Sequence, residues 1–261
     1  MQTDMTVGKP MKMILDFTIP VFIGNVFQQF YNMADAIIVG KFVGTKGLAA
    51  VGSTGTIMFL IIGFLTGLTA GFTVLTSQKF GAGKMDEMRQ SVGNAALLSI
   101  IISVIMTAVS MVGMHPLLTL MHTPEDIFQD AYTYIMIICG GIFAQVLYNI
   151  LASILRALGN SKTPLYFLIL AALLNIVLDL TFIIVFHMGV AGAAWATITA
   201  QGVSGVLCLI YIIKYVPELR LKADDWRFRS EIAKKEILVG IPMGLQYSIT
   251  AIGTMMVQSA L

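Results

Sequence analysis

Long apolar runs dominate this chain and predict helices that cross a membrane. The runs cover residues 14–39, 49–77, 92–114, 131–155, 164–187, 189–213 and 237–261. Each can span ~30 Å of hydrocarbon, because an α-helix rises ~1.5 Å per residue. We therefore predict an all-α, polytopic membrane protein, in which a tight turn at Met188–Gly189 joins the fifth helix to the sixth.

Polar side chains recur every three or four residues in several of these runs, which places them on one helix face. The stripes are Asn25, Gln28, Asn32 and Asp35; Thr66, Thr69, Thr73 and Ser77; Gln145 and Asn149; and Thr197, Gln201 and Ser204. Lipid cannot form hydrogen bonds with such faces, so they must turn toward each other or toward water. We predict a hydrated cavity lined by Asn25, Gln28, Asn32, Gln145, Asn149 and Gln201.

Acidic residues inside the apolar runs are the strongest functional signal. Asp179 lies in the fifth run, with Asn175 one turn before it, and Asp35 lies near the end of the first run. A charged residue at a helix centre costs ~2.5–3.5 kcal/mol on insertion scales, so such residues usually have a function. With Thr197, the two acids and the amide fall in the same half of the bundle and favour a cation or proton site. A merely structural hydrogen bond from Asp179, or contact of Asp35 with interfacial water, remains an alternative.

Two features favour movement of the helices. Pro20 removes a backbone hydrogen bond in the first helix and predicts a bend there. Gly63, Gly67 and Gly71 lie on one face of the second helix and predict close approach of another helix. Static bundles also contain both features.

The composition agrees with a membrane location. Hydrophobic residues make up 57% and charged residues 11% of the chain, against roughly a quarter charged in soluble domains. The mean hydropathy is +0.86. We expect no cleavable signal peptide, because residues 1–10 are polar and no small-residue cleavage site follows the first run.

The distribution of basic residues predicts the orientation. If the helices alternate in direction, fourteen of the sixteen Lys and Arg residues fall on one side, and only Lys41 and Lys46 on the other. The fourteen are Lys9, Lys12, Lys79, Lys84, Arg89, Arg156, Lys162, Lys214, Arg220, Lys222, Arg227, Arg229, Lys234 and Lys235. The positive-inside rule then places the N-terminus in the cytoplasm, and explains the basic segment without a nucleic-acid partner.

Cysteine and histidine usage adds little chemistry. Cys139 and Cys208 lie at different depths of their helices, so we predict packing rather than a disulfide. His115, His122 and His187 lack the spacing of metal ligands, and we interpret them as surface residues.

The last run restarts the first one: "ILVGIP" (Ile237–Pro242) echoes "ILDFTIP" (Ile14–Pro20). Transporters are often built of two such repeats. We predict a six-helix N-terminal lobe over residues 1–214, a basic cytoplasmic linker over 215–236, and over 237–261 the first helix of a second, inverted or pseudo-symmetric lobe. We expect the chain to be a fragment, because half of a bundle would expose its polar faces.

Several motifs, in this order, resemble those of multidrug and toxic compound extrusion (MATE) transporters. They are "IPVFIGNVFQQFYNMADAIIVGKFVGTKGLAAVG" (Ile19–Gly52), "QKFGAGK" (Gln78–Lys84), "LRALGNSKTP" (Leu155–Pro164), "NIVLDLTFI" (Asn175–Ile183) and "GVAGAAWATITAQ" (Gly189–Gln201). The resemblance covers nearly the whole chain.

This resemblance implies twelve helices in two lobes and export of drugs or metabolites in exchange for inward H⁺ or Na⁺. It implies a cation-coupling site of four residues, which fall on Asp35, Asn175, Asp179 and Thr197, and a helix-bending proline, which falls on Pro20. We expect a small-molecule substrate, a monomer in the lipid bilayer of the cell membrane, and no cofactor or metal other than the coupling ion.

Three other functions agree less well with the sequence. A lipid-linked oligosaccharide flippase of the same superfamily would line its cavity with basic residues, whereas here the intramembrane charges are acidic. An intramembrane aspartyl protease expects Tyr-Asp and Gly-x-Gly-Asp, but the sequence has Ala34-Asp35 and Leu178-Asp179, so we predict no enzyme. Repeated lobes and a Pro-bent helix fit a channel less well than a transporter that works by alternating access.

Overall fold

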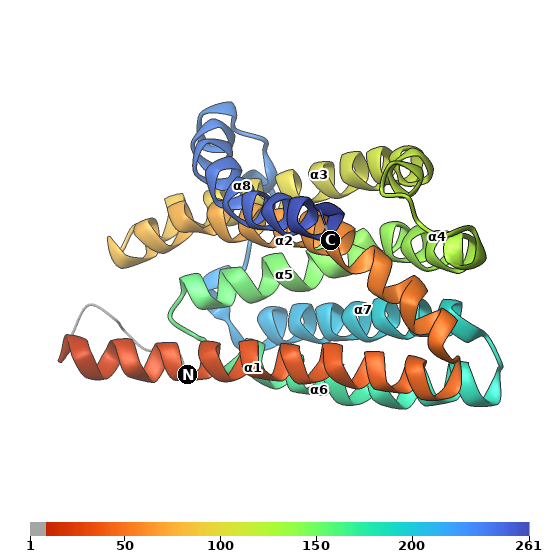
Figure 1. Cartoon of the computed structure of the whole chain (residues 1–261). Coiled ribbons are helices and arrows are strands. Elements are labelled where there is room, and N and C mark those ends of the chain that lie inside the picture. The colour runs from red at the N-terminus through yellow and green to blue at the C-terminus, as the bar shows by residue number, and fades with distance from the viewer. Residues whose placement is uncertain (1–8, 261) are drawn as a thin grey trace.

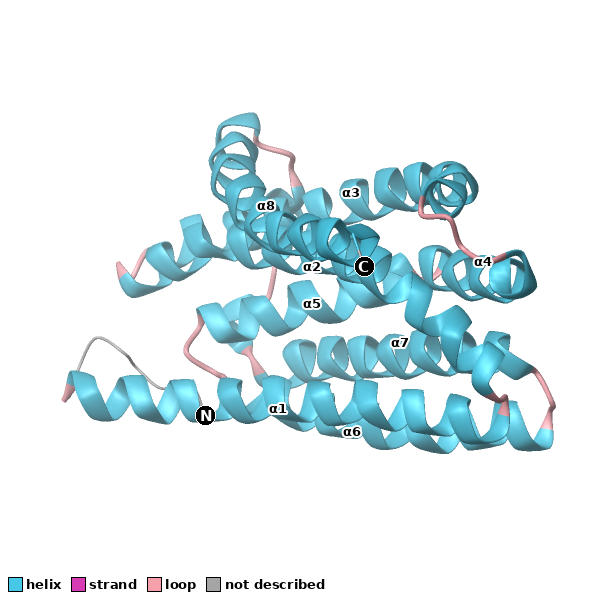
Figure 2. Ribbon diagram, in the orientation of Figure 1, coloured by secondary structure: helices cyan, strands magenta, loops and turns pink. Residues whose placement is uncertain are grey.

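The computed structural model describes the backbone of residues 9–260 and the side chains of 9–250 and 253. Helices account for nearly all of this part, and the loops between them are short (Figure 2). They are α1 (Pro10–Phe42), α2 (Thr45–Gly81), α3 (Met85–Leu120), α4 (Glu125–Gly140), α5 (Ile142–Ala157), α6 (Lys162–Leu180), the π-helix η1 (Thr181–Val185), α7 (Gly189–Tyr215), the 3₁₀ turns η2 (Pro217–Leu219) and η3 (Ala223–Trp226), and α8 (Ser230–Ala260). The all-α prediction is confirmed.

The long helices run back and forth between two ends of the bundle (Figure 1). The start of α1 and the connections α2–α3 and α5–α6 lie at the left end of the view, whereas α1–α2, α3–α4 and α6–α7 lie at the right end. Helix α6 packs against α1 and α7, and α2 packs against α3, α5 and α8. The left end is therefore the one that carries the connections predicted to be cytoplasmic.

Five described helices are long and apolar enough to cross a membrane: α1, α2, α3, α6 with η1, and α7. The pair α4 and α5 passes the same test of length and composition when taken together, and counts as a sixth span if the bent pair crosses as one. The prediction of one continuous helix over 131–155 is wrong, because α4 ends at Gly140, α5 begins at Ile142 and their axes differ by 48°. Consecutive glycines at this point offer little resistance to a bend.

The seventh predicted span, 237–261, begins within α8. Residue 261 and most side chains from 251 onward lie outside the described residues, so this span stays a prediction. The division into two lobes stays a prediction as well. So does the expectation of no cleavable signal peptide, because residues 1–8 lie outside the described residues.

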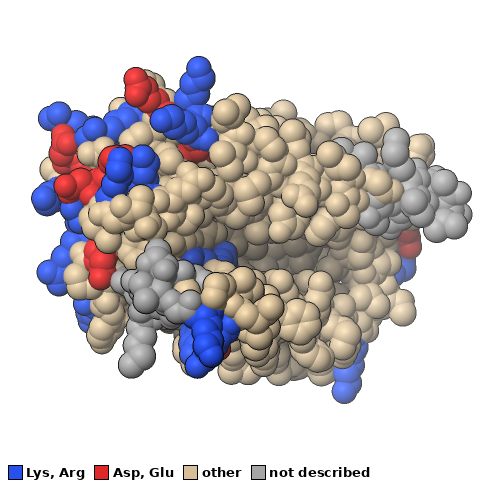
Figure 3. Space-filling view, turned by 90° about the vertical axis from the view of Figure 1, so that its left-hand side faces the viewer, with Lys and Arg blue, Asp and Glu red and all other residues tan. Residues whose placement is uncertain are grey.

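Apolar side chains fill the space between the helices and also cover much of the outside. The largest buried cluster joins α2, α3, α5, α7 and the start of α8, and it includes Phe72, Met88 and Leu155. Outward-facing Val112 and Leu238 are 82% and 72% exposed, as expected for side chains that contact lipid. In Figure 3, charged residues gather at one side of the visible face and uncharged residues cover most of the rest.

The glycine face of α2 meets α8. A β-carbon added to Gly67 would lie 2.4 Å from the Met243 carbonyl oxygen, and one added to Gly63 would lie 3.3 Å from the Tyr247 Cβ. Only glycine permits this approach of two backbones. The predicted close packing on this face is confirmed, and α8 is the partner.

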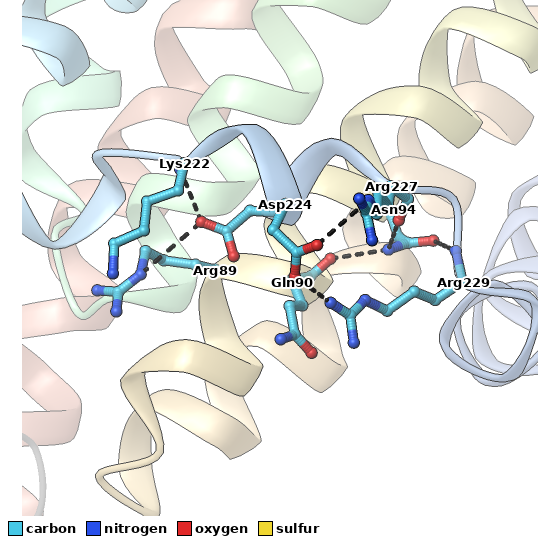
Figure 4. A network of polar contacts seen from close by, with 8 residues as sticks. Arg89, Gln90, Asn94, Lys222, Asp224, Arg227 and Arg229 are labelled. Carbon is cyan, nitrogen blue, oxygen red and sulfur yellow. Dashed lines mark hydrogen bonds and ion pairs between the residues drawn. The ribbon is translucent and has the colours of Figure 1, made fainter.

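The predicted linker is docked onto α3 rather than extended through solvent (Figure 4). The Asn94 side chain of α3 donates to the Arg227 carbonyl at 3.4 Å and accepts the Arg229 N–H at 2.8 Å. Asp225 accepts the Lys222 N–H at 2.8 Å and lies 4.0 Å from Arg89. These contacts fix the chain between α7 and α8.

The remaining Cys and His predictions agree with the structure. Cys139 and Cys208 are both buried and unpaired. His115, His122 and His187 are exposed, and His115 contacts the rings of Phe128 and Tyr132 edge-on.

Candidate functional site

Three helices position the four residues of the predicted coupling site. Asp35 lies on α1, Asn175 and Asp179 lie on α6, and Thr197 lies on α7. Asn175 and Asp179 are four residues apart, so both point from the same face of α6. Because α6 packs against α1 and α7, this face is covered: Asn175 and Asp179 are 0% exposed and Asp35 is 8% exposed.

The polar atoms of this site are only partly satisfied. The Asn175 amide donates to the Thr197 hydroxyl at 3.5 Å. Among the described residues, no donor reaches Asp35 Oδ1, Asn175 Oδ1 or either carboxylate oxygen of Asp179. The Asp35 and Asp179 carboxyl groups lie within hydrogen-bonding reach of each other, so one proton between them would join the pair. No ion pair of the described residues involves either Asp. Buried oxygens without a donor are costly, so this oxygen-rich set suits a proton or a small cation.

Two tyrosines that the sequence analysis did not select lie at the same place. Tyr31 interacts with Thr197 and with both acids. Tyr134 of α4 is 2% exposed and interacts with Asp35, Tyr31 and Asp179. Tyr31 precedes Asp35 by four residues, so helical spacing would have found it, but Tyr134 carries no such signal within α4.

A π-helix follows the site directly. Helix α6 ends at Leu180, one residue after Asp179, and the chain continues as η1 over Thr181–Val185. Short π-helical turns inside α-helices occur frequently at functional sites. The regular fifth helix predicted over 164–187 therefore changes its winding next to the buried acid.

The predicted cavity residues are distributed over several environments. Asn25 and Asn32 of α1 are exposed, and Gln28 is half-buried. On α5, Gln145 and Asn149 are half-buried, and the Asn149 amide donates to Thr66 Oγ1 at 3.4 Å. Gln201 is 4% exposed, and its Oε1 has no partner among the described residues.

The threonine stripe of α2 mostly bonds to its own helix. The Thr69 hydroxyl donates to the carbonyl four residues earlier, and the Thr73 and Ser77 hydroxyls donate to the carbonyls three residues earlier. Among the described residues, Thr66 is the member of this stripe that accepts a hydrogen bond from another helix, from Asn149 of α5. Burial of these hydroxyls therefore does not require water, because the helix itself supplies acceptors.

Pro20 lies inside α1 and is buried. The helix is continuous from Pro10 to Phe42 through this residue. Pro20 leaves one carbonyl of the preceding turn without its usual donor. The predicted bend stays a prediction.

Comparison with known proteins decides the family. The model of the MatE family matches residues 20–181, which is more than half of the chain. The chain belongs to the MatE family. The matched range contains three of the four predicted coupling residues, Asp35, Asn175 and Asp179. The homologues and structural neighbours of this MatE chain are membrane transporters, not enzymes.

Curated and solved relatives agree with this assignment. The MatE chain is 34% identical over 258 residues to "Probable multidrug resistance protein YpnP" of Bacillus subtilis, covering 98% of this chain and 57% of that protein. It superimposes with a TM-score of 0.86 on a MOP superfamily transporter from Pyrococcus furiosus, and equally on an outward-facing MATE family multidrug resistance transporter. Each of these structures is 29% identical to this chain. The match covers 92% of this chain and 53% of the other. The MatE chain thus spans about half the length of the relatives it matches.

Proposed function

We propose that this protein acts in secondary active transport, exporting cationic or amphipathic compounds in exchange for H⁺ or Na⁺. The ion would bind at Asp35, Asn175, Asp179 and Thr197. The single observation that carries the proposal is the set of buried oxygens on α1 and α6 that no donor of the described residues reaches, with the two carboxyl groups beside each other. A proton on one acid would supply a donor, and Na⁺ would be held by oxygen ligands, so either ion removes the cost of burial.

Exchange of ion for substrate requires that binding of one lowers the affinity of the protein for the other. Two ligands that bind to different sites of one protein change each other's affinity by the same factor. Substrate binding could change the affinity of this site for the ion, because the site is shared by α1, α6 and α7. A shift of α1 on substrate binding would change the distance between Asp35 and Asp179. Pro20 lies N-terminal to Asp35 in α1 and removes one backbone hydrogen bond of the helix, which would permit such a shift.

The sign of the buried charges supports a cationic cargo. The described ion pairs involve residues in the loops and helix ends, such as Lys46 with Asp126 and Arg229 with Asp224. The candidate site contains acids without basic partners. A phosphate-bearing lipid would require the reverse arrangement, so the flippase alternative is less well supported.

The test compares Asp179→Asn with Asp126→Asn in proteoliposomes, using the protein expressed from its natural gene. Ethidium efflux is driven by an imposed pH or Na⁺ gradient. An amide retains the size of the Asp179 side chain and removes its negative charge, so we expect loss of gradient-driven efflux with retained folding and ethidium binding. Asp126 has a side chain that is 57% exposed, and its variant should transport normally. Wild-type efflux in Asp179→Asn would refute the coupling role.

The expected surroundings complete the proposal. We propose a monomer in the cell membrane, with the N-terminus and the basic linker in the cytoplasm, a small-molecule substrate and no cofactor besides the coupling ion. The charge distribution supports this orientation, because fourteen of sixteen basic residues share one side under the predicted topology.

A further inference from the structure

A second buried acid lies at the linker end of the bundle, away from the site described above. Glu236 on α8 is 0% exposed. The Ser91 hydroxyl of α3 donates to Glu236 Oε1 at 2.8 Å, and Thr76 of α2 shares a 2.9 Å hydrogen bond with Ser91. Among the described residues, Glu236 Oε2 has no partner. One short chain of side chains thus joins three helices.

The helices around Glu236 offer it no cation. Helix α8 packs against α2 and α3. The charged groups at this end of the three helices, besides Glu236, are Lys79, Asp86, Glu87, Arg89, Glu231, Lys234 and Lys235, and the side chains of Lys234 and Lys235 are exposed. Lys79 pairs with Glu87, and Arg89 pairs with Asp86. No ion pair of the described residues reaches Glu236, so a negative charge on it would be buried without compensation.

The neutral form of Glu236 is therefore favoured. Glu236 precedes the apolar stretch that starts at Ile237, so it lies outside the predicted spanning segment. Burial raises the pKa of its carboxyl group to about 8, and the hydrogen bond from Ser91 lowers it by a smaller amount. Near neutral pH the group would carry its proton, and above this range it would lose it.

The position of Glu236 connects its proton to helix packing. Glu236 comes one turn before Gly240, whose Cα would be 2.4 Å from a β-carbon on Gly71 of α2. We call this backbone contact between Gly63, Gly67 and Gly71 of α2 and α8 the α2–α8 seam. The docked linker holds the start of α8 beside α3 through Asn94 (Figure 4). Glu236 therefore lies where the seam, the linker and α3 meet.

We propose that Glu236 is a proton-binding site that controls the end of the α2–α8 seam: the neutral side chain holds α8 against α2 and α3, and loss of its proton loosens this contact. The charged form must reach water, and α8 has to move for that, because the carboxyl group has no exposed surface in the packed state. The proposal does not depend on the transported compound or on the coupling ion.

The first experiment detects the proton itself. Infrared spectra of the reconstituted protein record the C=O absorption of neutral carboxyl groups, titrated from about pH 6 to about pH 10. The difference between wild type and Glu236→Gln should show one neutral carboxyl that disappears around the pKa of about 8. Glu231→Gln, which alters an exposed acid of the same helix, should leave this signal unchanged. A difference spectrum that shows only ionised Glu236 at neutral pH would overturn the proposal.

The second experiment detects the movement. Spin labels at Gln78→Cys on α2 and Lys234→Cys on α8, both exposed positions, report the distance across the end of the seam. We expect this distance to lengthen as the pH rises through the titration of Glu236, and to stay short in Glu236→Gln at every pH. The same lengthening in Glu236→Gln, or no change in the wild type, would refute the proposal.

A further variant keeps the test independent of the folding of Glu236→Gln. Ser91→Ala removes the hydrogen bond that favours the charged carboxylate, so both transitions should move to higher pH. A midpoint that is unchanged or lower in Ser91→Ala would contradict the assignment to Glu236. Neither readout requires substrate or an ion gradient, so their failure and the failure of the proposed exchange are distinguishable.

Discussion

Gly71 of α2 and Gly240 of α8 are in backbone-to-backbone contact, so that a β-carbon on Gly71 would lie 2.4 Å from the Gly240 Cα. A side chain on Gly71 would therefore force one of the two helices to move. The contact makes α8 part of the described bundle, although α8 follows the predicted linker.

The first prediction concerns this contact. Gly71→Ala should lower the thermal midpoint of the detergent-solubilised protein, with a loss of about 1–3 kcal/mol or more, because overpacking displaces α8. Gly55→Ala on the same helix provides the control. No atom lies within 4 Å of the added β-carbon there, so Gly55→Ala should be neutral or stabilising by up to ~1 kcal/mol. Equal midpoints for the two variants would contradict the packing argument.

The second prediction compares the buried acid of α1, Asp35, with an exposed acid of the same helix. Asp35→Asn should abolish ion-driven ethidium efflux and leave folding intact, because the amide cannot supply the negative charge. Asp16→Asn alters an exposed acid of the same helix and should transport like the wild type. If both variants retain efflux, Asp35 is not a coupling residue.

The third prediction concerns Thr197. Thr197→Ala removes the acceptor of the Asn175 amide and leaves a fully buried donor unpaired, which costs about 1–3 kcal/mol. We expect a lower thermal midpoint and weaker ion dependence of efflux. Thr197→Ser retains the hydroxyl and should restore both. Restoration of neither by serine would show that the methyl group, not the hydrogen bond, matters.

The fourth prediction addresses the docked linker. Asn94→Ala removes the side chain that binds the backbone at Arg227 and Arg229, so hydrogen exchange of the linker should become faster. Loss of a bond that leaves a buried partner unpaired predicts a change of about 1–3 kcal/mol in local opening. Ser99→Ala on α3 is the control, because its hydroxyl bonds to Ala95 of the same helix. Equal exchange in the two variants would refute the role of Asn94.

The fifth prediction tests the orientation. Single cysteines at Lys84 and Arg227 should react only with membrane-permeant reagents in intact cells, whereas a cysteine at Lys46 should react with impermeant ones. The three lysine and arginine side chains are 57%, 79% and 69% exposed, so access depends on the membrane alone. Labelling of Lys84 and Arg227 from outside would reverse the orientation.

Sequence periodicity predicted the helices well because lipid imposes a simple requirement. Every spanning segment must be apolar and must satisfy its own backbone, and exceptions such as Asp179 are therefore conspicuous. Spacing also placed Asn175 and Asp179 on one face and found the glycine face of α2. These features depend on residues that are close together in the sequence.

The features that could not be predicted depend on distant contacts. Asn94 and Arg229 are 135 residues apart, and nothing in the linker composition indicates where it docks. Burial of Glu236 requires Ser91 as a partner, 145 residues away. The break between α4 and α5 and the π-helix after Asp179 depend on how neighbouring side chains pack, which periodicity does not report.

The bend at Gly141 has a mechanical consequence for the candidate site. A β-carbon on Gly141 would lie 2.2 Å from Ile198 Cγ2, so the isoleucine packs directly against the bend. Ile198 is the residue after Thr197. A change in the angle between α4 and α5 would press on Ile198 or release it. Because Thr197 is the neighbouring residue of α7, its hydroxyl would move as well. One side-chain contact thus connects the bend to the residue next to Thr197, whose hydroxyl accepts from Asn175.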